Sequence, residues 1–139
     1  MKKITDIMTT KLVTLSADDN VHQARSLLKQ FNIRHLPIVD GEGKFAGMLT
    51  QRDLLNTAFT IVEKYGVGKL SQKEEQLKIA DIMSADTRTL PSSTSLIDAG
   101  RFFLQYKHAC LPIVDNGQLQ GIVTSVDFVK LSISLLEKN

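Results

Sequence analysis

The sequence is poor in the residues that characterise several common classes of protein. Only one of its 139 residues is a cysteine, Cys110, so no disulfide can form within the chain and a disulfide-stabilised domain is excluded. Tryptophan is absent and proline occurs only three times. The formal net charge is +2, and we therefore expect no nucleic-acid binding, which usually requires a clustered basic surface.

Long hydrophobic runs are also missing. No segment approaches the roughly 20 apolar residues of a membrane-spanning helix. After the basic start Met1–Lys3, the acidic Asp6 comes within three residues, and no apolar stretch of a signal peptide follows. We therefore expect neither a leader nor a membrane segment, and the single cysteine favours a reducing, cytoplasmic location. Hydrophobic residues make up 42% of the chain and charged residues 23%, which is typical of a globular protein with a buried core.

The chain contains an internal repeat. Ile4–Met8 recurs as Ile79–Met83, and Leu36–Asp40 recurs as Leu111–Asp115, both with an offset of 75 residues. The register between these pairs holds without a gap. After them the offset drops to 74, because the first turn is one residue longer than the second, and turns tolerate such changes. The sequence therefore predicts two copies of one structural unit.

Each copy is predicted to form a β-α-β-β-α unit, which places the protein in the α/β class. The capping residues Asn20 and Ser95 precede segments whose apolar residues recur every three or four positions, as expected for helices lying on a sheet. Short apolar runs followed by Asp-Gly or Asp-Asn-Gly predict hairpins. The expected strands are 13–15, 36–39 and 45–49 in the first copy and 88–90, 111–114 and 119–123 in the second.

The closing helix of each copy is expected to start after Thr50 or Thr124. The polar stretch that follows Gly66 predicts a surface linker between the copies. The domain boundaries are accordingly 1–65 for the first motif, 66–78 for the linker and 79–139 for the second motif.

Two motifs in each copy resemble those of the CBS domain, named after cystathionine β-synthase. In the first copy, Arg34–Asp40 contains Leu-Pro-Ile-Val-Asp and Gly47–Asp53 has the pattern Gly-x-x-Thr-x-x-Asp. Ala109–Asp115 and Gly121–Asp127 repeat both motifs in the second copy. The resemblance extends over nearly the whole chain except the linker, and it is strong because both motifs are duplicated in register.

The resemblance implies two CBS units packed with pseudo-two-fold symmetry, called a Bateman module, with two clefts between the copies. Members of the family commonly bind AMP, ADP, ATP or S-adenosylmethionine there and regulate an enzyme, channel or transporter. We therefore expect a stand-alone regulatory module that senses an adenosine-containing ligand, catalyses no reaction and acts on a separate protein. Apolar helical segments at 59–62 and 131–136 also favour a homodimer.

A ligand-binding role for the Thr-x-x-Asp motifs can be argued from chemistry alone. Thr50 and Thr124 lie where a strand passes into a helix, and the hydroxyl and free N–H groups of a first helical turn favour an anion such as phosphate. Asp53 and Asp127 follow one turn later, where a carboxylate can accept both hydroxyls of a ribose. Arg52 adds a candidate phosphate contact that the second copy replaces by Val126, so the two clefts are not expected to bind phosphate equally.

In the family each cleft takes residues from both copies, and the resemblance assigns the ligand-binding residues by position. Apolar residues would sandwich the base while strand backbone groups contact its edge. One predicted cleft combines Val13, Thr14, Ile33, Arg34 and His35 with Ile122, Thr124 and Asp127. The other combines Arg88, Thr89, His108, Ala109 and Cys110 with Met48, Thr50 and Asp53, beside Arg52.

Other interpretations of these residues remain open. Thr and Asp at a helix start are by default capping residues, and a CBS pair can serve as a dimerisation or protein-interaction scaffold with empty clefts. His35 and His108 show no metal-ligand spacing with other residues, and Cys110, inside an apolar strand, is expected to be a buried, unreactive thiol. With no nucleophile–base pair or phosphate loop, an enzyme is not expected.

Overall fold

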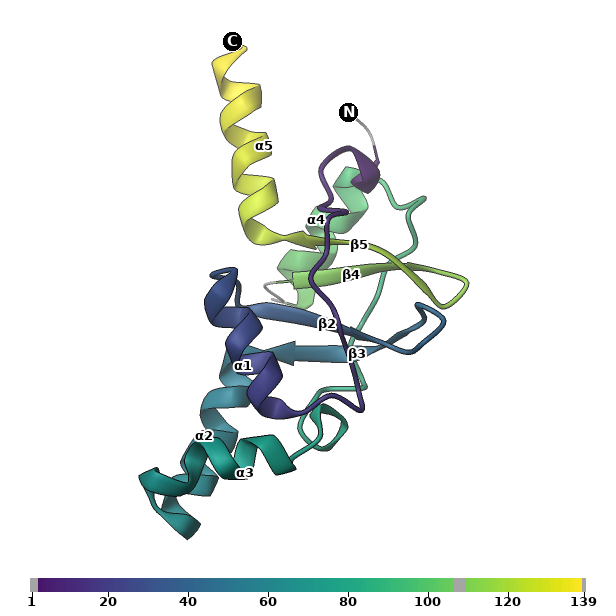
Figure 1. Cartoon of the computed structure of the whole chain (residues 1–139). Coiled ribbons are helices and arrows are strands. Elements are labelled where there is room, and N and C mark those ends of the chain that lie inside the picture. Colours follow the sequence, from purple (N-terminus) through teal and green to yellow (C-terminus); the bar gives the residue numbers. More distant parts are fainter. Residues whose placement is uncertain (1–2, 107–109, 139) are drawn as a thin grey trace. The chain divides into compact units, whose positions relative to one another are not determined.

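The structure is a computed structural model that describes residues 3–106 and 110–138 (Figure 1). It confirms the α/β class and the duplicated strand-helix pattern. The chain separates into two compact units: the β1–β3 unit runs from Val13 to Thr87, and the β4–β5 unit joins the N-terminal segment up to Leu12 to the chain from Arg88 onward. Among the described residues the longest helix has 15 residues, and none is long and apolar enough to cross a membrane.

The β1–β3 unit contains a three-stranded sheet in the order β1-β2-β3. β1 is parallel to β2, and β2 forms an antiparallel hairpin with β3. Helices α1, α2 and α3 pack against one another within this unit (Figure 1). Its elements are β1 (Leu15–Ser16), α1 (Val21–Gln30), β2 (His35–Val39), β3 (Phe45–Thr50), α2 (Gln51–Tyr65), η2 (Val67–Lys69), α3 (Leu70–Gln76) and η3 (Ile79–Asp81).

The β4–β5 unit repeats the hairpin with fewer flanking elements. β4 pairs with β5 in antiparallel fashion, and Leu90 forms a single parallel bridge to Ile113 where the other unit has β1. The predicted opening strands are therefore shorter than expected: 13–15 becomes Leu15–Ser16, and 88–90 is reduced to the Leu90 bridge. The elements are η1 (Ile4–Asp6), α4 (Leu96–Tyr106), β4 (Cys110–Asp115), β5 (Gln118–Thr124) and α5 (Ser125–Glu137).

Each unit has its own hydrophobic core, built from the predicted apolar stripe of its helix and the inner face of its hairpin. Val21, Ala24 and Leu28 of α1 pack with buried residues of β2 and β3. In the other unit Ala99 of α4 packs with Ile113 and Val123. Burial of these side chains contributes roughly 1.5–3 kcal/mol for each large aliphatic residue, so the repeated periodicity that predicted the helices also stabilises the units.

The Ile-x-Asp-Ile-Met segments are exchanged between the repeats. Ile4, which precedes the first hairpin in the sequence, is fully buried in the core of the β4–β5 unit, and Ile79 is buried in the core of the β1–β3 unit. Each segment then runs along the free edge of the hairpin of its unit. A Cβ at Gly47 would lie 2.6 Å from the Ser84 carbonyl oxygen, and one at Gly121 would lie 2.8 Å from that of Thr9. Both glycines therefore permit this close backbone approach.

The stretch predicted as a surface linker contains a packed helix, α3. Its Glu74 carboxylate is only 1% exposed and accepts hydrogen bonds from Arg25 of α1, with Nε–Oε1 2.8 Å and Nη2–Oε2 2.7 Å. The guanidinium also donates to the Leu54 carbonyl oxygen. A buried acid with an arginine partner fixes this helix on α1 and α2, so the segment 66–78 is not simply a solvated connection.

Candidate ligand-binding motifs

The first Thr-x-x-Asp motif forms a capping box at the start of α2. The Thr50 hydroxyl accepts a hydrogen bond from the Asp53 N–H at 3.1 Å, and Asp53 Oδ2 accepts one from the Thr50 N–H at 2.9 Å. Oδ1 of Asp53 has no hydrogen bond to any described residue. Because a carboxylate offers about four lone-pair positions, capping leaves Asp53 able to accept ligand hydroxyl groups.

The second motif has a similar arrangement with a different hydroxyl bond. Asp127 Oδ2 accepts from the Thr124 N–H at 2.8 Å and from the Thr124 hydroxyl at 3.3 Å. Both carboxylates are half-buried, which restricts their orientation without closing them off from solvent. The repeat therefore places two carboxylates in equivalent positions, each on the first turn of a helix with unused acceptor capacity.

The residues before each strand proline lie at the same end of the hairpin as the threonine. His35 is paired with Thr50 across β2 and β3, and Cys110 is paired with Thr124 across β4 and β5. The Gln51 N–H donates to the Arg34 carbonyl oxygen at 2.9 Å. Within each unit the structure thus brings the two predicted ligand-binding motifs of that repeat together.

His35 and Cys110 occupy equivalent positions in the two repeats, but the pKa values of their side chains are shifted in opposite directions. Burial, followed by the positive charge of Arg34, holds the pKa of His35 below its ordinary value of 6.5. Burial, followed by the charge of Asp127, raises the pKa of Cys110 to about 12. Cys110 is therefore a protonated, buried thiol at neutral pH, in agreement with the expectation of an unreactive cysteine.

Three residues predicted to contact the ligand lie beside the core of the β1–β3 unit. Val13 and Ile33 pack on its edge, and Thr14 is half-buried next to β1. These residues retain some exposure, so their side chains can still contact a ligand as well as the core.

Met48 and Ile122 occupy equivalent positions on the edge strands. Met48 exchanges backbone hydrogen bonds with Ser84 at 2.9 and 3.0 Å, and Ile122 does the same with Thr9 at 3.0 and 2.9 Å. Their backbone groups are therefore already paired, and of the two side chains Met48 is buried, at 4% exposed, whereas Ile122 is half-buried.

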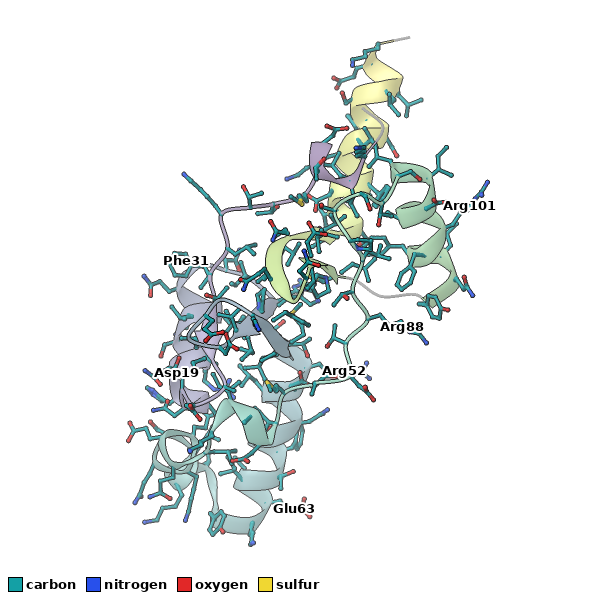
Figure 2. The ribbon with its side chains drawn as sticks, turned by 90° about the vertical axis from the view of Figure 1, so that its right-hand side faces the viewer. Asp19, Phe31, Arg52, Glu63, Arg88 and Arg101 are labelled. Atoms are coloured by element: carbon teal, nitrogen blue, oxygen red, sulfur yellow. The ribbon has the colours of Figure 1, made fainter. Side chains whose placement is uncertain are left out.

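The predicted cationic residues are exposed on their units. Figure 2 shows Arg52 near the start of α2 and Arg88 on the extended segment before α4. The Arg88 guanidinium carbon lies 3.8 Å from the centroid of the Tyr106 ring, while Arg34 and Thr89 are also exposed. Arg88 would have to exchange part of this cation–π contact for a phosphate contact.

His108 and Ala109 lie outside the described residues. Pairing of the motifs across the two repeats, which the resemblance implies, remains a prediction. In the part of the chain that the structure describes, no three His, Cys, Asp or Glu residues gather as they would around a metal ion.

Sequence reasoning missed a groove beside the first motif. Its volume is about 350 Å³, within the range of small-molecule sites. Helical spacing places Asn56, Thr57 and Thr60 on the turns that follow Asp53, but no signal in the sequence links them to Asp81 and Ile82. The lining residues are Asp53, Asn56, Thr57, Thr60, Asp81 and Ile82.

The fold and its paired motifs define a class of protein: a duplicated α/β module in which each repeat carries one candidate ligand-binding carboxylate. Comparison with known proteins identifies the family, since the model of the CBS domain matches residues 4–59 and 79–134. The chain belongs to the CBS domain family. It is 33% identical over 128 residues to the CBS domain-containing protein YhcV of Bacillus subtilis, covering 91% of this chain and 83% of YhcV.

Two solved structures of similar fold are complexes with adenosine derivatives. The crystal structure of CBSX2 in complex with AMP has a TM-score of 0.81 and 28% identity, covering 97% of this chain and 98% of CBSX2. The CBS domain pair of protein MJ0100, in complex with 5′-methylthioadenosine and S-adenosyl-L-methionine, has a TM-score of 0.75 and 26% identity, covering 95% of this chain and 96% of that one.

Other relatives are much longer than the matched region. The chain spans 31% of the uncharacterized protein MJ1404 of Methanocaldococcus jannaschii, to which it is 32% identical, with 92% of this chain covered. It spans 21% of inosine-5′-monophosphate dehydrogenase of Bifidobacterium longum, at 35% identity and with 88% of this chain covered. The CBS pair is a regulatory module, and the similarity concerns this module and not the whole of the longer proteins.

Proposed function

We propose that the protein is a regulatory module that binds an adenosine-containing ligand, of the AMP, ADP, ATP or S-adenosylmethionine type, in clefts between its two repeats. The observation that carries the proposal is the pair of equivalent carboxylates, Asp53 and Asp127, which are oriented by helix capping and keep unused acceptor capacity. Two hydroxyls on adjacent ribose carbons match such an acceptor. The AMP and S-adenosylmethionine complexes of similar folds support this ligand class.

The two clefts are expected to differ in charge preference. Arg88 and Arg34 are assigned one to each cleft, but Arg52 stands beside Asp53 where Val126 stands beside Asp127. The Asp53 cleft therefore favours a more highly phosphorylated ligand, and the other tolerates a neutral or singly charged one. Ligand occupancy acts on a partner protein, in a reducing, cytoplasmic compartment suited to the free thiol of Cys110.

A ligand panel tests this function. AMP, ADP, ATP, S-adenosylmethionine, NADH and cyclic dinucleotides are added to the purified protein, and melting temperature and binding heat are measured. A ligand at about a hundred times its dissociation constant adds about 2.7 kcal/mol of stability, which raises the melting temperature by several degrees. If no compound shifts the melting temperature or releases heat, the sensor function is wrong and the scaffold function is favoured.

We propose, second, that the chain forms a homodimer through α2 and α5. Both helices carry exposed apolar stripes, and these stripes are equivalent under the 74-residue offset. Phe59 is 68% exposed and its counterpart Ile133 is 50% exposed. Exposed apolar stripes repeated in this way are typical of an interface. The matched pairs are Leu55 with Val129, Phe59 with Ile133, and Val62 with Leu136.

Light scattering at micromolar concentration and above tests the assembly. We expect about twice the chain mass of 15.5 kDa, and Phe59→Glu, which places a charge within the stripe, should return the mass to that of one chain. A wild-type mass near 15.5 kDa over the whole concentration range would contradict the homodimer.

A further inference from the structure

A second hollow lies between α2 and α3, at the end of α2 marked by Glu63 in Figure 2. Its volume is about 240 Å³. This lies just below the usual range for drug-sized ligands, so the hollow suits a small metabolite better than a nucleotide. Its lining residues are Ile61, Tyr65, Lys73, Gln76 and Leu77.

The walls of the hollow are apolar on the inside and polar towards solvent. Ile61 is buried, and Leu77 packs against the core of the β1–β3 unit. Tyr65 and Gln76 are exposed, and Lys73 is half-buried. A ligand in this hollow would therefore place an apolar body inward and a polar group at the rim.

The rim of the hollow carries a positive charge, because Lys73 is one of its lining residues. The Lys73 ammonium lies 4.1 Å from the centroid of the Tyr65 ring and the Lys64 ammonium lies 5.4 Å from it. In the described part of the chain no carboxylate lies within 4.0 Å of either ammonium. Glu74 of α3 is buried in its ion pair with Arg25 and does not neutralise them. An anion in the hollow would supply the Lys73 ammonium with the opposite charge that the described residues do not provide.

We propose that this hollow is a binding site for a small organic anion with an apolar body, namely an aromatic or branched aliphatic carboxylate. The apolar body contacts Ile61, Leu77 and the part of the Tyr65 ring that the Lys73 ammonium leaves uncovered. The carboxylate accepts hydrogen bonds from the Lys73 ammonium, which has three donors, only part of which the ring occupies. The site lies outside both Thr-x-x-Asp motifs and is independent of adenosine binding.

The test uses phenylacetate as the probe and phenylacetamide as its uncharged analogue. Each is titrated into the ¹⁵N-labelled full chain, and the backbone amide resonances of Tyr65, Lys73 and Gln76 are followed. Lys73→Gln removes the proposed anion contact without altering a buried residue. Lys69→Gln, an exposed lysine of η2, is the control for the same change in net charge.

We expect phenylacetate to shift these resonances saturably and phenylacetamide to bind at least about threefold more weakly. Lys73→Gln should weaken phenylacetate binding about three- to tenfold, since a partly exposed ionic hydrogen bond contributes modestly, while Lys69→Gln should bind like the wild type. The proposal is overturned if the acid and the amide bind equally, if both variants weaken binding equally, or if the shifts fall elsewhere or do not appear.

Discussion

At the level of the single residue, Asp53 and Asp127 cap their helices, and the proposed function gives each a second role as a ligand contact. Each carboxylate accepts from the N–H of its own motif threonine, which is the reciprocal hydrogen bond of a capping box. The sequence predicted these residues as caps or as ligand contacts, and the structure confirms the capping without excluding the second role. Capping orients the carboxylate, and an oriented acceptor loses less entropy when a ligand binds.

Asn56, Thr57 and Thr60 illustrate why part of the site could not be predicted at this scale. They line the groove beside Asp53, but polar residues on one side of a helix are usually a solvated face. Their inclusion depends on the packing of η3 beside α2, and this contact joins Asp81 to residues more than 20 positions earlier. Spacing along the chain carries no signal for that contact.

His35 makes stability depend on pH. Its pKa is held below the ordinary value of 6.5, so between pH 6.5 and the lower folded-state pKa the unfolded chain binds more protons than the folded chain. The contribution of neutral His35 to the free energy of unfolding is fully present above pH 6.5, and it is lost as the pH falls through this window. We expect the free energy of unfolding to fall more from pH 7.5 to 5.5 in the wild type than in His35→Gln. Urea denaturation at both pH values measures this, and parallel losses would contradict it.

At the level of elements, the helix starts were predictable because their signals are local. Asn20 and Gln23 form the expected reciprocal capping bonds at 2.8 Å, and the Ser95 hydroxyl accepts from the Asp98 N–H. Helix α3 was not predicted. Its seven residues are mostly polar, and the side chain that fixes it, Glu74, is paired with an arginine 49 residues away. Sequence periodicity over one or two turns cannot reveal such a distant partner.

The ion pair of α3 gives a test of this packing. Arg25→Leu would leave the Glu74 carboxylate buried without a partner, and we expect a loss of about 3 kcal/mol in the free energy of unfolding. This is the low end of the usual range, because the Arg25 side chain is 39% exposed. The double variant Arg25→Leu with Glu74→Leu removes both charges and should recover most of the loss. Urea denaturation measures the free energy of unfolding of both variants. If the single and double variants are equally unstable, the unpaired Glu74 carboxylate is not the cause of the loss.

At the level of the whole molecule, the repeat and the family were readable from the sequence, while the exchange of the Ile-x-Asp-Ile-Met segments was not. The offset of 75 residues shows only that Ile4 and Ile79 are equivalent. Both hairpins carry a glycine, Gly47 or Gly121, that admits a segment to their edge. The two Ile-x-Asp-Ile-Met segments have the same local sequence pattern, and so do the edges of the two hairpins. Chain connectivity and core packing therefore decide which segment pairs with which hairpin.

The central claim is that the capped carboxylates bind an adenosine-containing ligand, and calorimetry with AMP tests it most directly. Asp53→Ala and Asp127→Ala remove the acceptor, while Asp53→Asn and Asp127→Asn keep an oxygen that can cap the helix. Gln23→Ala, which breaks the capping box of α1, is the control for cap loss elsewhere in the chain.

The proposed function assigns each aspartate to a different cleft, so each Asp→Ala change should weaken a different binding event. Loss of a charged acceptor typically costs about 1.5–3 kcal/mol, or roughly ten- to a hundredfold in affinity. The Asp→Asn variants should show the same loss of affinity with a smaller drop in melting temperature, and Gln23→Ala should bind AMP like the wild type while melting lower. If the aspartate variants titrate with AMP like the wild type and only melt several degrees lower, these residues are helix caps alone and the assigned ligand site is wrong.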